Sequence, residues 1–207
     1  MRIELKRIGK RYQREWIYRN VNLALDSSNA YVITGGNGSG KSTLLKTIAG
    51  FLIPTEGEIN YFAGDTLIDQ DKVHELMSLA TPYISTFESF TLKEALDFHQ
   101  KFRPFSQGID TQKAIALLDL EKAKNKQIKV FSSGMKQRVK LGLAFFSESK
   151  MLLLDEPTSN LDHNAIDWYQ DQVNTFRKDK LTVVASNKQK DEYFFCTEEI
   201  QLQKFKP

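Results

Sequence analysis

Hydrophobic and polar residues alternate at two places near the start of this chain. Ile3 and Leu5 are separated by a polar residue, and Val21, Leu23 and Leu25 repeat the same spacing. Successive side chains of a strand point to opposite faces of a sheet, so this alternation is typical of strands with one buried face. The pattern predicts two strands of an N-terminal antiparallel sheet.

Two later runs are continuously apolar and only a few residues long: residues 151–154 and 181–184. Strands buried on both faces, as in a parallel sheet, have this pattern. The two runs therefore predict buried strands of a parallel sheet.

Helical signals dominate residues 84–146. Thr91 and Glu94 form a capping box before an apolar face that breaks at Pro104. A second helix is expected over residues 111–118. A third begins near Ser132, with apolar residues at helical spacing up to Phe146. We therefore predict a helical subdomain (84–146) inserted into a core lobe made of residues 1–83 and 147–207.

Composition indicates an ordinary globular chain. With 207 residues, of which 41% are hydrophobic, it can bury one sizeable core. The net charge of +3 is mild and gives no reason to expect a nucleic-acid partner, although the N-terminal residues are locally basic. The single Cys196 excludes an internal disulfide, and no apolar run is long enough for a signal peptide or a membrane span. We expect a cytosolic protein.

Residues 35–43 read G-G-N-G-S-G-K-S-T, directly after a β-prone run and before a helical pattern. Glycines allow successive backbone N–H groups to point inward at phosphate oxygens. Lys41 supplies a charge for the β- and γ-phosphates, and Ser42 supplies a hydroxyl ligand for Mg²⁺. The loop predicts binding of ATP or GTP, through Gly35, Asn37, Gly38, Ser39, Gly40, Lys41, Ser42 and Thr43.

A carboxylate pair, Asp155 and Glu156, ends the apolar run at 151–154. At this place Asp155 can hold Mg²⁺ through water, and Glu156 can polarise an attacking water molecule. Together with the phosphate loop, the pair predicts nucleotide hydrolysis.

Residues 131–138, F-S-S-G-M-K-Q-R, stand about twenty residues before the carboxylate pair. In this order and spacing the chain resembles the ATP-binding cassette (ABC) ATPases, whose signature is L-S-G-G-Q, over essentially its whole length. The copy is imperfect, since Ser133 and Met135 depart from that signature. The resemblance implies that Ser132 and Gly134 contact the γ-phosphate bound by a second cassette. Ser132 could equally be an ordinary helix cap.

The resemblance carries two more positions. Tyr12 matches the aromatic residue that stacks on adenine, with Trp16 as the competing candidate and plain packing as the alternative for either ring. Asp162 matches the loop that crosses the dimer interface, with a helix N-cap as its alternative role.

Two positions depart from the family pattern. Tyr83 stands where the family has a Gln that senses the γ-phosphate, and Asn187 stands where it has a switch His. Asn187 can donate a neutral hydrogen bond but cannot carry a proton. Because Glu156 is intact, we expect ATP hydrolysis that is slow rather than absent.

The expected fold is α/β, a P-loop NTPase with a RecA-like parallel sheet, an antiparallel β subdomain and an inserted helical subdomain. The expected function is the ATPase subunit of an ABC transporter, of the export type by family analogy. Its expected cofactors are ATP and Mg²⁺. Its expected partners are a second cassette, in a homodimer or a heterodimer, and an integral membrane permease. It would lie on the cytoplasmic face of the cell membrane, with Phe87 and Phe90 near the docking surface or in the core. A soluble nucleotide-dependent regulator that moves no solute is the alternative.

Overall fold

The computed structural model describes residues 1–82 and 87–206. Its contacts divide the chain into two compact units. The strand-rich unit comprises Met1–Leu79, Ser149–Glu156 and Asp179–Pro207, and the helical unit comprises Ala80–Glu148 and Pro157–Lys178.

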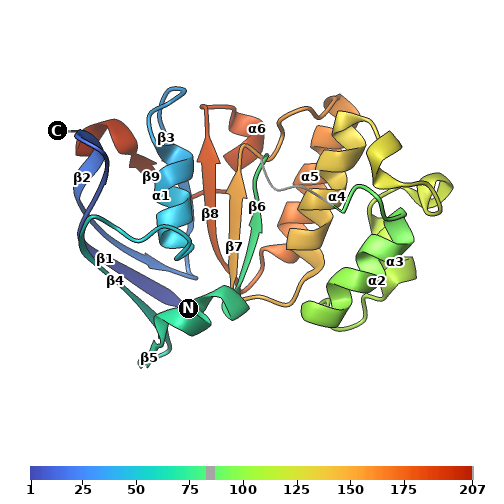
Figure 1. The fold of residues 1–207 in the computed structure, drawn as a ribbon, viewed down its shortest axis with the longest axis horizontal. Coiled ribbons are helices and arrows are strands. Elements are labelled where there is room, and N and C mark those ends of the chain that lie inside the picture. Colours follow the sequence, from blue (N-terminus) through green and yellow to red (C-terminus); the bar gives the residue numbers. More distant parts are fainter. Residues whose placement is uncertain (83–86, 207) are drawn as a thin grey trace. The chain divides into compact units, whose positions relative to one another are not determined.

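The strand-rich unit contains the predicted antiparallel sheet (Figure 1). Its strand order is β2 (Glu15–Asp26), β1 (Arg2–Tyr12), β4 (Glu56–Ala63), β5 (Thr66–Ile68). Ile3 pairs with Leu25 and Leu5 with Leu23, which confirms the two strands expected from the alternating pattern. Gly57 has φ +83°, and a Cβ there would lie 2.3 Å from the carbonyl oxygen of Lys6, so the pairing of β4 with an irregular part of β1 requires glycine.

A second, five-stranded sheet carries the predicted parallel core. Its order is β6 (Met77–Ala80), β7 (Met151–Asp155), β8 (Leu181–Ser186), β3 (Ala30–Thr34), β9 (Glu198–Gln201). Strands β3, β7 and β8 are buried along their whole length and pair in parallel. This confirms the reading of the continuous apolar runs.

Short helices complete the strand-rich unit. Helix α1 (Lys41–Ile48) buries Leu44, Leu45 and Ile48 in the same core as the side chains of the two sheets. The remaining elements are α6 (Lys190–Tyr193), η1 (Gln70–Leu76) and η4 (Leu202–Phe205). One core therefore anchors the helix that begins in the phosphate loop.

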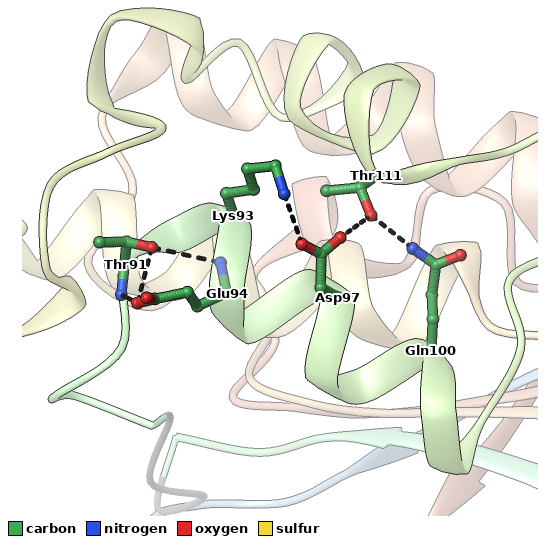
Figure 2. A network of polar contacts seen from close by, with 6 residues as sticks. All are labelled: Thr91, Lys93, Glu94, Asp97, Gln100 and Thr111. Atoms are coloured by element: carbon green, nitrogen blue, oxygen red, sulfur yellow. Dashed lines mark hydrogen bonds and ion pairs between the residues drawn. The ribbon is translucent and has the colours of Figure 1, made fainter.

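The helical unit contains α2 (Leu92–Phe102), α3 (Thr111–Leu117), α4 (Ser133–Phe146) and α5 (His163–Phe176), with the short turns η2 (Glu121–Ala123) and η3 (Ile128–Val130). The capping box of Thr91 and Glu94 is present, and α2 ends before Pro104 as predicted. Figure 2 shows how polar contacts tie α2 to α3: the Thr111 hydroxyl donates to Asp97, and Gln100 donates to Thr111 at 2.7 Å.

Aromatic contacts join α4 to α5. Phe145 lies 6.4 Å from Trp168 and 6.1 Å from Tyr169, and Phe146 lies 5.2 Å from Phe176, measured between ring centroids. Pro157–Lys178 consequently groups with the helices. Compact units defined by contacts need not coincide with the predicted lobes, so the boundaries at 83/84 and 146/147 stay a prediction.

Among residues 1–82 and 87–206, no helix has the length and apolar character needed to cross a bilayer.

Candidate nucleotide-binding and hydrolysis site

The phosphate loop connects the end of β3 to the start of α1. Gly38 and Gly40 have φ of +72° and +101°, a region that disfavours side chains. A Cβ on Gly40 would lie 2.2 Å from Cγ2 of Ile17, and a Cβ on Gly35 would lie 2.5 Å from the Ser39 hydroxyl. The backbone path therefore favours glycine at positions 35, 38 and 40.

Lys41 is the first residue of α1 and is only 4% exposed. Its ammonium donates to the carbonyl oxygens of Gly35 at 3.0 Å and Gly36 at 3.1 Å, and to Oδ1 of Asn187. The first turn of α1 contains no acidic residue. A positive charge therefore lies beside the N-terminus of a helix, where backbone N–H groups and the helix dipole favour anions.

Ser42 and Asp155 meet at the base of this loop. The Ser42 hydroxyl donates to Oδ1 of Asp155 at 3.0 Å, and Asp155 is 1% exposed. Its Oδ2 has no hydrogen-bond partner among the described residues. Burial raises the pKa of the Asp155 carboxyl, an effect that the hydrogen bond from Ser42 partly opposes.

These two side chains fit a magnesium ion. Mg²⁺ prefers oxygen ligands, keeps several waters, and is usually held by one or two carboxylates and the substrate phosphates. In the described part of the chain no three His, Cys, Asp or Glu side chains gather into an all-protein metal site. Ser42 and Asp155 instead offer a hydroxyl beside a buried carboxylate that has one oxygen without a partner. This suits a Mg²⁺ ion that takes its other ligands from water and the substrate phosphates.

Glu156 follows directly after β7. Its backbone N–H donates to the Ala185 carbonyl at 2.9 Å, and its φ of +44° lies in the left-handed region, which is unusual for a residue with a side chain. Its Oε1 accepts a hydrogen bond from Nδ2 of Asn187 at 2.6 Å. The structure thus brings Glu156, Asn187 and Lys41 into one chain of contacts.

The parallel sheet explains why these segments meet. Strand β8 lies between β3 and β7, with Ser186 opposite Thr34 and Ala185 opposite Asp155. The carboxyl ends of the three strands therefore share one edge of the sheet, where ligands of α/β folds bind. Asn187 is the next residue after β8 and consequently lies between the phosphate loop and Glu156.

Of the two candidate adenine-stacking rings, Tyr12 is the more accessible. It ends β1 at the hairpin turn and is 47% exposed, with the Lys10 ammonium 5.3 Å from its centroid. Trp16 is half-buried, and the guanidinium groups of Arg11 and Arg19 lie 5.1 Å and 4.6 Å from its ring. The contacts of Trp16 favour a packing role for that ring.

In the helical unit, Ser132 is the N-cap of α4, and its hydroxyl accepts from the Met135 N–H at 3.2 Å. Asp162 is the N-cap of α5 and accepts from the Ala165 N–H at 2.9 Å. Both alternative capping roles are thus present. They do not exclude contact with an anion at Ser132, because the accepting hydroxyl retains a proton to donate.

Ser132, Gly134 and Asp162 line a shared cavity of about 340 Å³. Asn160 and Arg138 also line it and were not predicted from the sequence. Their nearness in sequence to Asp162 and Ser132 is the signal that could have identified them. Asn160 has φ +65° and its carbonyl oxygen would lie 3.2 Å from a Cβ on Gly134, so a small residue fits best at that position.

Tyr83 lies outside the described residues. Phe87 is 48% exposed and stacks on Phe90 at 5.4 Å, and both rings contact Phe98, at 4.9 Å and 5.5 Å. Phe98 in turn contacts Phe102, which is 76% exposed. We call Phe87, Phe90, Phe98 and Phe102 the aromatic cluster. Its rings pack against one another, and those of Phe87 and Phe102 are also exposed on the surface.

Comparison with known proteins identifies the family. The model of the ABC transporter family matches residues 18–159, which include the phosphate loop, the signature segment and the carboxylate pair. The chain therefore belongs to the ABC transporter ATP-binding family.

Curated relatives agree with this assignment. An uncharacterised ABC transporter ATP-binding protein of Bacillus subtilis, YybJ, is 26% identical over 92% of this chain and 87% of its own length. The Fe(3+) ions import ATP-binding protein FbpC 1 of Pectobacterium atrosepticum is 32% identical over 78% of this chain. The chain spans 47% of FbpC 1, about half of that relative's length.

Solved structures share the fold. A putative ABC transporter ATP-binding protein of Pyrococcus furiosus matches with a TM-score of 0.83 and 19% identity, covering 100% of both chains. The ATP-binding cassette MJ0796, solved as a dimer in a post-hydrolysis state with ADP and Pi, matches with a TM-score of 0.80 and 22% identity over 97% of this chain and 94% of that one. The predicted fold, a P-loop NTPase of the ABC cassette type, is confirmed.

Proposed function

We propose that this chain is the ATPase subunit of an ABC transporter, where it hydrolyses ATP together with a second cassette and drives a separate membrane permease. The observation that carries the proposal is the meeting of Lys41, the Ser42–Asp155 pair and Glu156 at one edge of the parallel sheet. Each element is needed for a different part of phosphoryl transfer.

The phosphate loop binds and orients the nucleotide. Backbone N–H groups of the loop, including Asn37, Ser39 and Thr43, and the Lys41 ammonium hold the phosphates, while Tyr12 stacks on adenine without reading its edges. Ser42 and Asp155 would hold Mg²⁺, which when bound neutralises charge on the phosphates. Binding then requires Lys41 to exchange backbone carbonyls for phosphate oxygens.

Hydrolysis uses Glu156. Its carboxylate accepts a hydrogen bond from the attacking water, orients it and takes its proton. Asn187 can donate a hydrogen bond but brings no positive charge to the developing negative charge. Loss of one well-placed donor typically costs about 10²–10³ in rate, so we expect slow turnover.

The second cassette supplies the remaining contacts. Ser132 and Gly134, at the N-terminus of α4, suit the γ-phosphate held by the opposite chain, and Asp162 lies at the same cavity. Closure of the pair around ATP would move a permease docked on the helical unit near the exposed rings of the aromatic cluster. The chain would then lie on the cytoplasmic face of the membrane. An export-type system is the analogy we favour.

ATP-driven pairing tests this arrangement. The Glu156→Gln variant retains the binding groups but lacks the base. We therefore expect it to form a dimer with ATP and to remain a monomer with ADP, as measured by analytical ultracentrifugation. Lys41→Met should stay monomeric with either nucleotide. A Glu156→Gln variant that binds ATP but never pairs would contradict a dimer of two copies of this chain.

A further inference from the structure

We propose that the strand-rich unit carries a second anion site, between β2 and the turn η4, that binds a ligand bearing phosphate groups. A cavity of about 420 Å³ lies there, lined by Arg19, Asn20, Lys204, Phe205 and Lys206. Figure 1 shows the C-terminal end of the chain beside β2. The cavity shares no residue with the phosphate loop, the carboxylate pair or the signature segment, so this site is additional to the proposed function.

The charge of the cavity is positive. Three of its five lining residues are cations and none is acidic. Within residues 1–82 and 87–206, the side chains of Lys204 and Lys206 form no hydrogen bond or ion pair. Glu199 feels the charge of Lys204 only weakly, since the hydrogen bond from Thr34 is the largest cause of its lowered pKa and Lys204 is the smallest. Two ammonium groups are therefore available to an anion.

Arg19 is held in place by two neighbours. Its Nε and Nη2 donate to the Glu56 carboxylate at 3.0 Å and 2.9 Å, and its guanidinium carbon lies 4.6 Å from the centroid of the Trp16 ring. A guanidinium group has five N–H donors, so three of them remain after the contacts with Glu56. Because Glu56 and Trp16 fix the guanidinium plane, a ligand would meet these donors already oriented.

Asn20 also offers a donor. Its Oδ1 and its carbonyl oxygen accept from the Asn22 amide at 3.2 Å and 3.1 Å, which leaves the NH₂ group of Asn20 for another partner. The backbone at Asn20 is left-handed, with φ +56°, a conformation that asparagine tolerates. The side-chain polar groups of the cavity that have no partner in the described part of the chain are therefore all donors.

The core anchors the turn that carries the lysines. Leu202 is fully buried, and Phe205 is half-buried and packs against the same core. Lys204 and Lys206 stand on either side of Phe205 and are exposed. The two charges are thus held close together at the cavity, where their mutual repulsion favours binding of an anion.

A phosphate group suits this set of donors better than a carboxylate does. Two ammonium groups, a guanidinium edge and an amide offer more donors than the two oxygens of a carboxylate use, whereas a phosphate group presents at least three oxygens and carries up to two charges. The volume lies in the range of small-molecule sites and leaves room for more than one phosphate. A soluble phosphorylated compound and a phospholipid headgroup share this chemistry.

The first test measures binding of inorganic pyrophosphate by isothermal titration calorimetry, with excess ADP present to occupy the phosphate loop. The double variant Lys204→Gln/Lys206→Gln should raise the Kd for pyrophosphate about tenfold or more, because two charged contacts are lost. The matched control is Lys122→Gln/Lys124→Gln. Those lysines are also exposed and flank one apolar residue, Ala123, so the control removes the same charge from another surface.

The Kd for ADP should be the same in both double variants. Pyrophosphate Kd values within threefold of each other in the two variants would overturn the proposal, as would no binding of pyrophosphate by the unaltered chain. Loss of ADP binding in Lys204→Gln/Lys206→Gln alone would also overturn it, because the lysines would then act on the nucleotide site.

The second test locates the bound anion. Pyrophosphate should shift the side-chain amide resonances of Asn20, assigned by NMR through their loss in Asn20→Asp, and should leave those of Asn60 on β4 in place. Binding of pyrophosphate without a shift at Asn20 would place the anion elsewhere and refute this site.

Cosedimentation with phosphatidylglycerol vesicles, with phosphatidylcholine vesicles as the reference, then distinguishes the two sources of phosphate. Vesicle binding that is lost in Lys204→Gln/Lys206→Gln and kept in Lys122→Gln/Lys124→Gln would support the site and assign it to a lipid headgroup. Pyrophosphate binding that depends on Lys204 and Lys206, without any such dependence for vesicles, would support a soluble phosphorylated ligand.

Discussion

The Ser42 hydroxyl donates to one carboxylate oxygen of Asp155 at 3.0 Å, while the other oxygen of Asp155 is buried without a hydrogen-bond partner among the described residues. A buried acceptor with no partner costs free energy of folding. The nucleotide-free protein therefore carries a penalty at the position where magnesium and its waters would bind.

Replacing this carboxylate should stabilise the empty protein and abolish its response to magnesium. The pKa of Asp155 is raised, so the folded state holds its proton more tightly than the unfolded state, and its ionisation lowers stability as pH rises through the folded pKa. We expect Asp155→Asn to raise Tm at pH 7 without ligand. The gain should be on the order of 1 kcal/mol.

Thermal unfolding with ADP, with and without Mg²⁺, checks this prediction. Magnesium should raise the Tm of the unaltered chain further and leave that of Asp155→Asn unchanged. An equal magnesium response in the two proteins would rule out Asp155 as a ligand.

The left-handed backbone at Glu156 predicts a trade between stability and activity. A residue with a side chain at φ +44° costs of order 1 kcal/mol, which glycine avoids. Both Glu156→Gly and Glu156→Ala lose the carboxylate, so we expect neither to hydrolyse ATP and the glycine variant to be the more stable by about 1 kcal/mol in urea unfolding. Glu58, on β4, lacks a positive φ and is the control, where alanine should be the more stable replacement.

A partly buried histidine makes the helical unit sensitive to acid. His99 stacks on Phe105 and its Nε2 lies 2.8 Å from the Ser147 hydroxyl, and burial lowers the pKa of His99 to about 4. Between pH 6.5, the ordinary pKa of histidine, and about pH 4, His99 binds a proton in the unfolded state but remains neutral in the folded state. Stability is therefore fully present above pH 6.5 and is lost as pH falls towards 4.

Urea unfolding at pH 7 and pH 5 measures this effect. Between pH 7 and pH 5, the free energy of unfolding of the unaltered chain should fall by on the order of 1–2 kcal/mol more than that of His99→Gln. The exposed His163 supplies a control, since His163→Gln should retain the full pH dependence. Equal losses in all three proteins would contradict the assignment to His99.

Tyr12 should contribute to ATP affinity more than Trp16 does. Stacking of a base on an aromatic ring is worth roughly 1–3 kcal/mol, so Tyr12→Ala should weaken ATP binding about tenfold or more, and Tyr12→Phe should bind normally. Trp16→Ala should chiefly lower Tm because its ring packs against Arg11 and Arg19. Isothermal titration calorimetry separates the two, and a larger affinity loss for Trp16→Ala would reverse the assignment.

Local patterns in the sequence predict most of this fold. The two-residue alternation in β1 and β2, the apolar runs of β7 and β8 and the capping box of α2 each reflect a short-range rule that the structure obeys. The glycine spacing identifies the phosphate loop for a similar reason, because Gly38 and Gly40 have positive φ, a conformation that glycine adopts without strain.

Other features depend on distant parts of the chain and leave no local signal. Lys41 and Asn187 are 146 residues apart and meet only because β3 and β8 are paired in register. The left-handed backbone of Glu156 and the orphaned oxygen of Asp155 likewise arise from the sheet edge and from burial. The family pattern indicated that Asn187 replaces a switch residue, but it did not indicate that the amide joins the phosphate loop to Glu156.

The most direct test of the central claim is magnesium-dependent ATP hydrolysis by the purified chain over a series of protein concentrations, with Glu156→Gln as the paired variant. Turnover that is slow, rises more than linearly with protein concentration and disappears in Glu156→Gln is the predicted result. Tight ATP binding by the unaltered chain with no turnover at any concentration would contradict a self-sufficient ATPase.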